Sequence, residues 1–159
     1  MISLSVFLFA FSFSDQRSLA KGGSDPIELV IKNVKTLKKN SKDIAVEFFV
    51  INRNPFPVYL NNPSCWGTSR PSIKYNGGKV PPAIKVKVDP ACAKVLVQIK
   101  ANDTLHMKYD FNIERFIDLS KSGNYKLQFE YNGALFNEKK NKLNDITLAS
   151  NEISFDVQD

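Results

Sequence analysis

The stretch from residue 118 to residue 131 constrains the fold of this chain more than any other. It reads Asp-Leu-Ser-Lys-Ser-Gly-Asn-Tyr-Lys-Leu-Gln-Phe-Glu-Tyr. Gly123 permits a tight corner, and from Tyr125 onward apolar and polar residues alternate, as in a strand with one buried face. In β-sandwiches, a tyrosine just after such a corner returns its hydroxyl to upstream backbone and stabilises the crossover between two sheets. We therefore expect Tyr125 to be buried and hydrogen-bonded to the backbone of residues 112–122.

Most of the remaining chain also consists of short alternating segments separated by turn residues. The strongest strand is predicted at 43–51, and its two partly apolar faces place it in the middle of a sheet. Other strands are predicted at 27–34, 58–60, 73–75, 84–88, 95–99, 104–111, 125–131, 146–148 and 152–157. Hairpins are predicted at 38–42 and 76–78, and one helical turn within 112–124. Short strand segments at regular intervals without strand–helix alternation predict an all-β fold, an antiparallel β-sandwich of about seven to nine strands.

The first 20 residues differ in composition from the rest of the chain. Residues 2–13 carry no charge, and they are too few to span a bilayer but match the apolar core of a signal peptide. Ser18-Leu19-Ala20 offers small residues for a signal peptidase, although no Lys or Arg precedes the apolar run. We expect a signal peptide at 1–20, a linker at 21–25 and one domain at 26–159. A buried first strand of the domain is the alternative interpretation.

The two cysteines, Cys65 and Cys92, match an exported chain with one disulfide. A metal site would require more thiols or histidines, and a nucleophilic cysteine would require a base. The only histidine is His106, which lies in an alternating strand. We therefore predict a disulfide, no metal and a secreted, periplasmic or cell-envelope location. No second apolar stretch reaches membrane-spanning length, so no transmembrane segment is expected in the mature chain.

The formal net charge of +6 favours attraction to anionic surfaces. The sequence contains no Gly-rich phosphate loop, no Gly-x-Ser-x-Gly and no His-Glu-x-x-His, and its acidic residues are spread out. Asp43, Asp103 and Asp145 fall in predicted turns, where Asp is favoured for local hydrogen bonds. The sequence therefore predicts a chain that is not an enzyme, requires no cofactor and binds no specific nucleic acid.

The segment Ser122-Gly-Asn-Tyr-Lys-Leu-Gln-Phe129 resembles the penultimate strand of immunoglobulin-like domains. Together with the residues before it, from Phe116, it is similar to the corner in accessory domains of exported bacterial proteins and in propeptides of some secreted peptidases. Leu127 stands where an antibody domain carries its second cysteine, and the 43–51 strand has no cysteine. Trp66 comes late after that strand for the buried core tryptophan. The resemblance therefore implies an immunoglobulin-like architecture, and no activity.

In such a sandwich the loop after the second strand and the loop between the last two strands lie at the same end. Here these loops are predicted at 52–57 and 132–145, and each carries an aromatic residue beside cations. The candidate binding residues are Arg53, Phe56, Phe136, Lys139, Lys140 and Lys142. The alternative is that Phe56 closes the end of the core and that the lysines are only solvated.

Two functions follow. The first is an exported, non-catalytic binding or accessory module that contacts a partner protein or an anionic polysaccharide or surface through these loops. The second is a proteinase inhibitor or chaperone-type domain, similar to the immunoglobulin-like bacterial proteinase inhibitors. It would present the segment 64–71, which the disulfide would hold as a rigid exposed loop.

Overall fold

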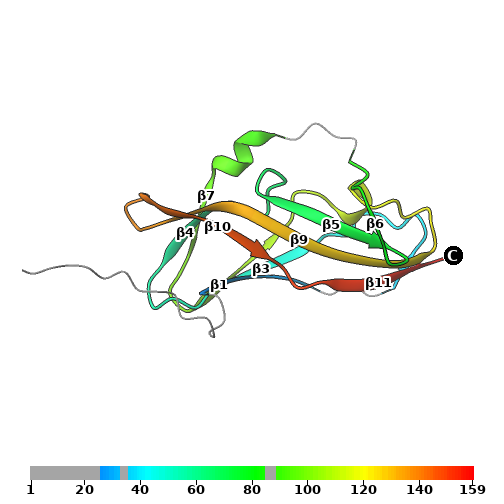
Figure 1. The fold of residues 1–159 in the computed structure, drawn as a ribbon, viewed down its shortest axis with the longest axis horizontal. Helices are drawn as coiled ribbons and strands as arrows, with labels where there is room; N and C mark the ends of the chain where they lie inside the picture. Colours follow the sequence, from blue (N-terminus) through cyan, green and yellow to red (C-terminus); the bar gives the residue numbers. More distant parts are fainter. Residues whose placement is uncertain (1–25, 33–35, 85–88) are drawn as a thin grey trace, which may run out of the picture.

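The computed structural model describes residues 26–32, 36–84 and 89–159. The signal peptide and linker predicted at 1–25, and most of the strand predicted at 84–88, lie outside the described residues. No helix in the described part is long and apolar enough to cross a membrane. The described chain is an all-β sandwich, which confirms the predicted fold class (Figure 1).

The described residues form eleven strands and two short 3-10 helices, so there are more strands than the seven to nine predicted. The strands are β1 Ile27–Ile31, β2 Leu37–Lys38, β3 Glu47–Asn52, β4 Val58–Asn61, β5 Ser69–Tyr75, β6 Gly78–Val80, β7 Leu96–Ile99, β8 Asp103–Lys108, β9 Gly123–Phe136, β10 Lys142–Ala149 and β11 Ile153–Gln158. The helices are η1 Pro90–Lys94, which the sequence did not predict, and η2 Ile113–Arg115, which is the predicted helical turn.

One sheet contains three antiparallel strands in the order β1-β3-β8, so β3 lies in the middle as predicted. The larger sheet is organised around β9, which runs the length of the molecule (Figure 1). Strands β11 and β10 pair with successive parts of β9 along one side, and β5 and β4 do so along the other. Pairing is antiparallel except between β2 and β11, which are parallel.

The hairpin predicted at 38–42 does not join β1 to β3. Instead β2 crosses to the larger sheet, where the Lys39 N–H donates to the Gln158 carbonyl at 2.7 Å. The polar residues after Leu37 favoured a simple turn, but the crossing lets Leu37 pack against the core. Strands β1 and β3 still pair in antiparallel fashion.

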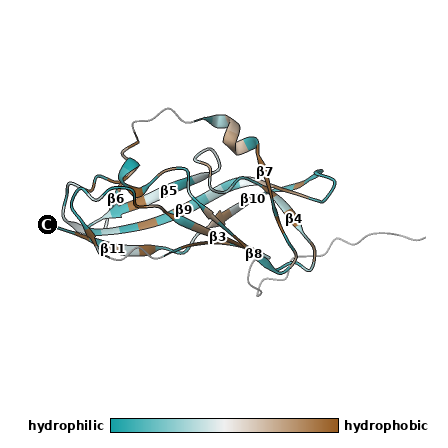
Figure 2. Cartoon of the chain, turned by 180° about the vertical axis from the view of Figure 1, so that it is seen from behind, coloured by the Kyte–Doolittle hydropathy of each residue, from teal (hydrophilic) through white to brown (hydrophobic). Residues whose placement is uncertain are grey.

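The core lies between the two sheets, and apolar residues that alternate with polar ones along several strands supply it (Figure 2). In β9 every second residue from Tyr125 to Tyr131 is buried, and β11 buries alternate residues in the same way. Aromatic rings join the layers, because Phe48 of β3 lies 4.8 Å from Phe129 of β9 and 5.1 Å from Tyr109 between ring centroids. This apolar contact across the layers is the main source of the fold's stability.

The long loop predicted at 132–145 is instead a β-hairpin. Strand β9 continues to Phe136, β10 begins at Lys142, and the Lys140 N–H donates to the Asn137 carbonyl at 2.9 Å in the turn between them. Asn132 and Gly133, with which the predicted loop began, lie inside β9. A side chain at Gly133 would overlap the Tyr131 hydroxyl, so glycine is required here by that ring rather than by a turn.

Candidate functional site

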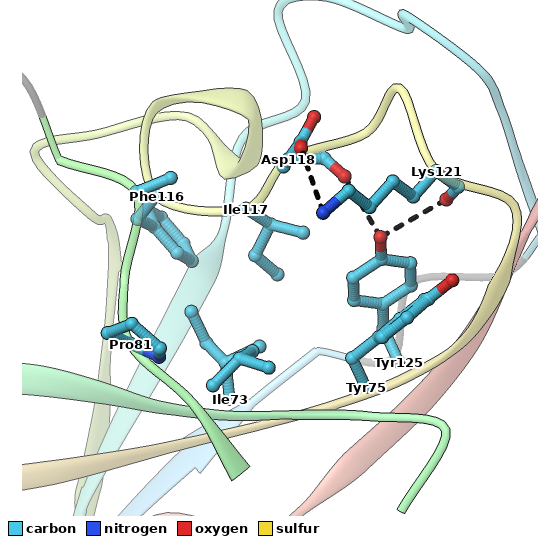
Figure 3. A pocket seen from close by; sticks show the side chains of 10 residues that line it. Ile73, Tyr75, Pro81, Phe116, Ile117, Asp118, Lys121 and Tyr125 are labelled. Atoms are coloured by element: carbon cyan, nitrogen blue, oxygen red, sulfur yellow. Dashed lines mark hydrogen bonds and ion pairs between the residues drawn. The ribbon is translucent and has the colours of Figure 1, made fainter. Parts of the chain in front are cut away.

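The corner before β9 has the geometry predicted from the sequence. Tyr125 is only 3% exposed, and its hydroxyl lies 2.9 Å from the Asp118 carbonyl and 3.1 Å from the Lys121 carbonyl (Figure 3). Gly123 has φ +150°, and a Cβ there would lie 2.8 Å from Tyr75 Cε2. The corner therefore requires both the glycine and the tyrosine.

A second tyrosine, which sequence reasoning missed, joins the β5–β6 hairpin to this corner. The Tyr75 hydroxyl donates to the Ser122 carbonyl at 3.0 Å, and its ring centroid lies 4.9 Å from that of Tyr125. At the turn of the same hairpin, Asn76 Oδ1 accepts the Asn124 N–H at 3.0 Å. The hairpin signal at Asn76-Gly77 located the turn but not its partner, because that partner is nearly fifty residues away.

The hairpin and the corner enclose a hollow of about 260 Å³, which we call the corner pocket. Its lining residues are Ile73, Tyr75, Val80, Pro81, Ala83, Phe116, Ile117, Asp118, Lys121 and Tyr125 (Figure 3). The Ala83 N–H donates to the Phe116 carbonyl at 2.8 Å and closes one side. At the rim, Lys121 Nζ lies 3.8 Å from Asp118 Oδ2.

The opposite end of the sandwich carries the predicted binding residues. Phe56, in the turn after β3, is 52% exposed, and Leu143 at the start of β10 is 53% exposed. Both border an apolar hollow of about 350 Å³, which we call the end groove. Its lining residues are Pro26, Ile27, Asn54, Phe56, Leu135, Leu143, Asn144, Ile146, Thr147 and Leu148. The 52–57 turn and the β9–β10 hairpin therefore meet at one end, as predicted.

The two predicted aromatic residues do not form a pair. Phe136 lies in β9 rather than in a loop, is partly buried, and lines a separate hollow with Ala134 and Asp145. Neighbouring residues of a strand point to opposite faces, so Leu135, and not Phe136, joins Phe56 in the end groove. The exposed partner that the sequence did not indicate is Leu143, which lies at a register shift between Lys142 and Asn144.

The four predicted cations differ in their surroundings. Arg53 pairs with Glu28 at 2.7 Å, and Lys142 pairs with Asp145 at 2.7 Å. Lys139 and Lys140 are exposed on the β9–β10 turn, and neither makes an ion pair with the residues that the structure describes. Of the four predicted cations, only these two are therefore available to an anionic partner without breaking an ion pair within the described chain.

Cys65 and Cys92 form a disulfide with their α-carbons 5.8 Å apart, which satisfies the geometric requirement of the predicted bond. Asp110 lies beside it, with Oδ2 3.5 Å from Cys92 Sγ and accepting the Trp66 N–H at 3.2 Å. Burial raises the pKa of Asp110, and the Trp66 N–H opposes that shift. The cysteines and Asp110 are the one group with metal-like spacing in the described chain, but disulfide sulfurs are not thiolate ligands.

The segment 64–71 is not the exposed loop that the inhibitor function requires. Cys65 and Ser69 are completely buried, and Ser69 begins β5. Trp66 is 8% exposed and belongs to the core, with the Arg70 guanidinium 4.9 Å from its ring centroid. The disulfide therefore holds this segment against the core rather than exposing it to a proteinase.

His106 lies on the outer face of the small sheet. Its side chain is 51% exposed, its ring stacks on Phe49 with centroids 4.8 Å apart, and Nε2 lies 3.8 Å from Glu47 Oε2. A hydrogen bond from Lys32 lowers the pKa of Glu47. Stacking on Phe49 and the nearby charge of Glu47 therefore account for the position of His106 on this exposed surface.

No family model, curated protein or solved structure matches this chain.

Proposed function

We propose that this chain is an exported, non-catalytic binding module, and that it contacts a partner protein through the end groove. The observation that carries the proposal is the exposure of Phe56 and Leu143 on either side of a single apolar hollow. Exposed apolar patches of this kind, rimmed by polar residues, mark interaction surfaces in soluble proteins. A partner that inserted an apolar side chain between them would remove both side chains from water.

The charge beside the groove indicates the electrostatic character of the partner. Lys139 and Lys140 lie on the turn of the β9–β10 hairpin, whose strands supply Leu135 and Leu143 to the groove. A partner with acidic residues next to its apolar contact would match both features, because complementary charge guides association and orientation. The apolar lining favours a protein over an anionic polysaccharide, which has no apolar side chains to insert.

Export and immunoglobulin-like architecture are part of the same proposal. The disulfide supports an oxidising compartment, and the bonded Tyr125 corner supports the architecture. A non-catalytic role agrees with the surroundings of His106 and of the Cys65–Cys92–Asp110 group described above.

The experiment is affinity capture from the native secretome with the exported protein as bait. Phe56→Ser with Leu143→Ser removes the apolar contact, and Lys139→Ser with Lys140→Ser removes the charge. The matched control is Val95→Ser with Lys94→Ser, since Val95 is also 53% exposed but lies beside η1, outside the groove lining.

We expect both test variants to lose the captured protein, and the control to retain it. Binding should also weaken as salt rises, because exposed charges are screened over about 8 Å at physiological ionic strength. Equal capture by all variants would contradict the proposal. Capture of a polysaccharide, lost only with the lysines, would assign the end to an anionic polymer instead.

A further inference from the structure

The corner pocket is a hollow that the proposed function does not use. Its floor is the hydrophobic core itself, since Ile73, Phe116 and Ile117 are each at most 3% exposed. An apolar cavity of about 150 Å³ accommodates benzene. The 260 Å³ of the corner pocket is therefore enough for a fused two-ring system or a medium-length alkyl chain.

Two hydrogen bonds hold the pocket in shape. On one side the Ala83 N–H donates to the Phe116 carbonyl, and on the other the Tyr75 hydroxyl donates to the Ser122 carbonyl. These bonds connect the end of β5 and the segment that follows β6 to the corner before β9. A hollow that is already formed binds a ligand with little ordering cost, which is a general property of small-molecule sites.

The rim of the pocket supplies one cation. The Lys121 side chain extends across the mouth above Tyr125, and its Nζ lies 3.8 Å from Asp118 Oδ2 (Figure 3). That distance is long for a charge-assisted hydrogen bond, which is commonly about 2.7–2.9 Å. The Lys121 side chain is 65% exposed, and a lysine has three donors, so the ammonium can take a further acceptor while it stays near Asp118.

We propose that the corner pocket binds a small organic carboxylate, with its apolar body against Ile73 and Ile117 and its carboxylate on the Lys121 ammonium. The apolar walls disfavour a bare inorganic anion, because such an ion would lose its hydration without enough hydrogen bonds in return. The mouth carries one cation, Lys121, and one anion, Asp118, so a carboxylate is favoured over a neutral molecule of the same shape where it meets the Lys121 donors that point away from Asp118. This site lies at the opposite end from the end groove, so it can be tested independently of the proposed function.

The first test compares two probes of equal body, 1-naphthylacetate and 1-naphthylmethanol, by methyl NMR titration of the exported full chain. We expect saturable shifts of the methyl groups of Ile73, Val80 and Ile117 with both probes. The acetate should bind about fivefold tighter at low salt, which is the scale of an exposed ion pair. Lys121→Met should reduce acetate binding to that of the alcohol and leave the alcohol unchanged, whereas Lys139→Met should change neither.

A second variant fills the pocket from an exposed position. Ala83→Trp keeps the backbone N–H that bonds to Phe116 and places a ring over the mouth. We expect it to remain folded and to abolish the shifts with both probes. The proposal is overturned if 1-naphthylacetate causes no saturable shifts up to its solubility, if the shifts map outside the pocket, or if Ala83→Trp binds the probe as well as the parent.

Discussion

The two ends of this sandwich are both built from a hairpin and a neighbouring turn, but they differ in whether their side chains are hydrogen-bonded or exposed. At the corner end, Tyr75 and Asn76 of the hairpin bind the backbone of the corner, and Tyr125 binds backbone carbonyls of the corner that precedes it. At the hairpin end, Phe56 and Leu143 are more than half exposed around a groove. The comparison predicts that substitutions at the corner end lower the free energy of unfolding more than substitutions at the hairpin end do.

The largest effect that would test this comparison is expected at Gly123. Gly123 has a φ of +150°, which is strained for any residue with a side chain. Gly123→Ala would also place a Cβ 2.8 Å from both Asn76 Oδ1 and Tyr75 Cε2. We expect a loss of about 3 kcal/mol in the free energy of unfolding, measured by chemical denaturation. The control is Gly78→Ala in the same region, whose nearest neighbour would lie at an ordinary 3.6 Å. Equal effects at both positions would show that the corner is not specially constrained.

Tyr125→Phe should have the next largest effect. It keeps the buried ring but removes a hydroxyl that lies within hydrogen-bond distance of two carbonyls. We expect a cost of about 1 kcal/mol, rising to about 3 kcal/mol if a carbonyl is left buried and unpaired. Tyr59→Phe is the control, since the Tyr59 hydroxyl makes no hydrogen bond to the described residues. A neutral Tyr125→Phe would mean that the corner bond does not stabilise the fold.

The hairpin end should tolerate substitution. Phe56→Ser should lower the free energy of unfolding by less than about 1 kcal/mol, because half of the ring is already in water. Lys139→Ser with Lys140→Ser should change it by less than about 0.5 kcal/mol. Thermal and chemical unfolding measure both values. A loss comparable to that of Gly123→Ala would show that Phe56 closes the core, and the comparison of the two ends would fail.

The smallest expected effect is a change with pH in the free energy of unfolding, caused by the protonation of Glu152. Its carboxylate accepts hydrogen bonds at 2.8 Å from Lys126 and from Lys74, which lie opposite each other on β9 and β5. These bonds lower the pKa of Glu152 below its ordinary value of 4.5. Because the folded-state pKa is the lower one, the stabilisation is present above about pH 4.5 and is lost as the pH falls through that pKa.

Glu152→Gln should therefore be less stable than the parent near neutral pH, and the two stability curves should converge in acid. Denaturation between pH 3 and 7 provides the measurement. Glu138→Gln is the matched control for removing one surface carboxylate, because Glu138 lies on the exposed turn of the hairpin end and makes no ion pair with the described residues. If the stability difference between Glu152→Gln and the parent did not change with pH, the two lysines would not have the stabilising role assigned to them.

Local patterns predicted the faces of the strands but not all of their connections. Alternation identified the buried sides of β3, β9 and β11, and the Gly123–Tyr125 spacing predicted the corner bond. The loop predicted at 132–145 was wrong, because Asn132 and Gly133 lie inside β9, where the Tyr131 ring leaves no room for a side chain at Gly133. The crossing of β2 depends on what Leu37 contacts in the folded core, and no local signal encodes that.

The candidate sites were predictable to a similar extent. The sequence placed Phe56 and the hairpin at one end, but it paired Phe56 with Phe136 because the extent of β9 was underestimated. The corner pocket was not predicted at all. Its walls combine Ile73, Ala83 and Phe116, which are apart in the chain and meet only through long-range packing.

The fourteen residues of β9 have a consequence for how the chain folds. Its partners β4 and β5 precede it by dozens of residues, and β10 and β11 follow it, so all of its pairings can form only after β11 has been made. Because most of these pairings are distant in sequence, folding should be slow and highly cooperative. The amide hydrogens of β9 should then exchange with solvent only on global unfolding, and truncation after residue 141 should leave an open, aggregation-prone strand edge rather than a smaller stable domain.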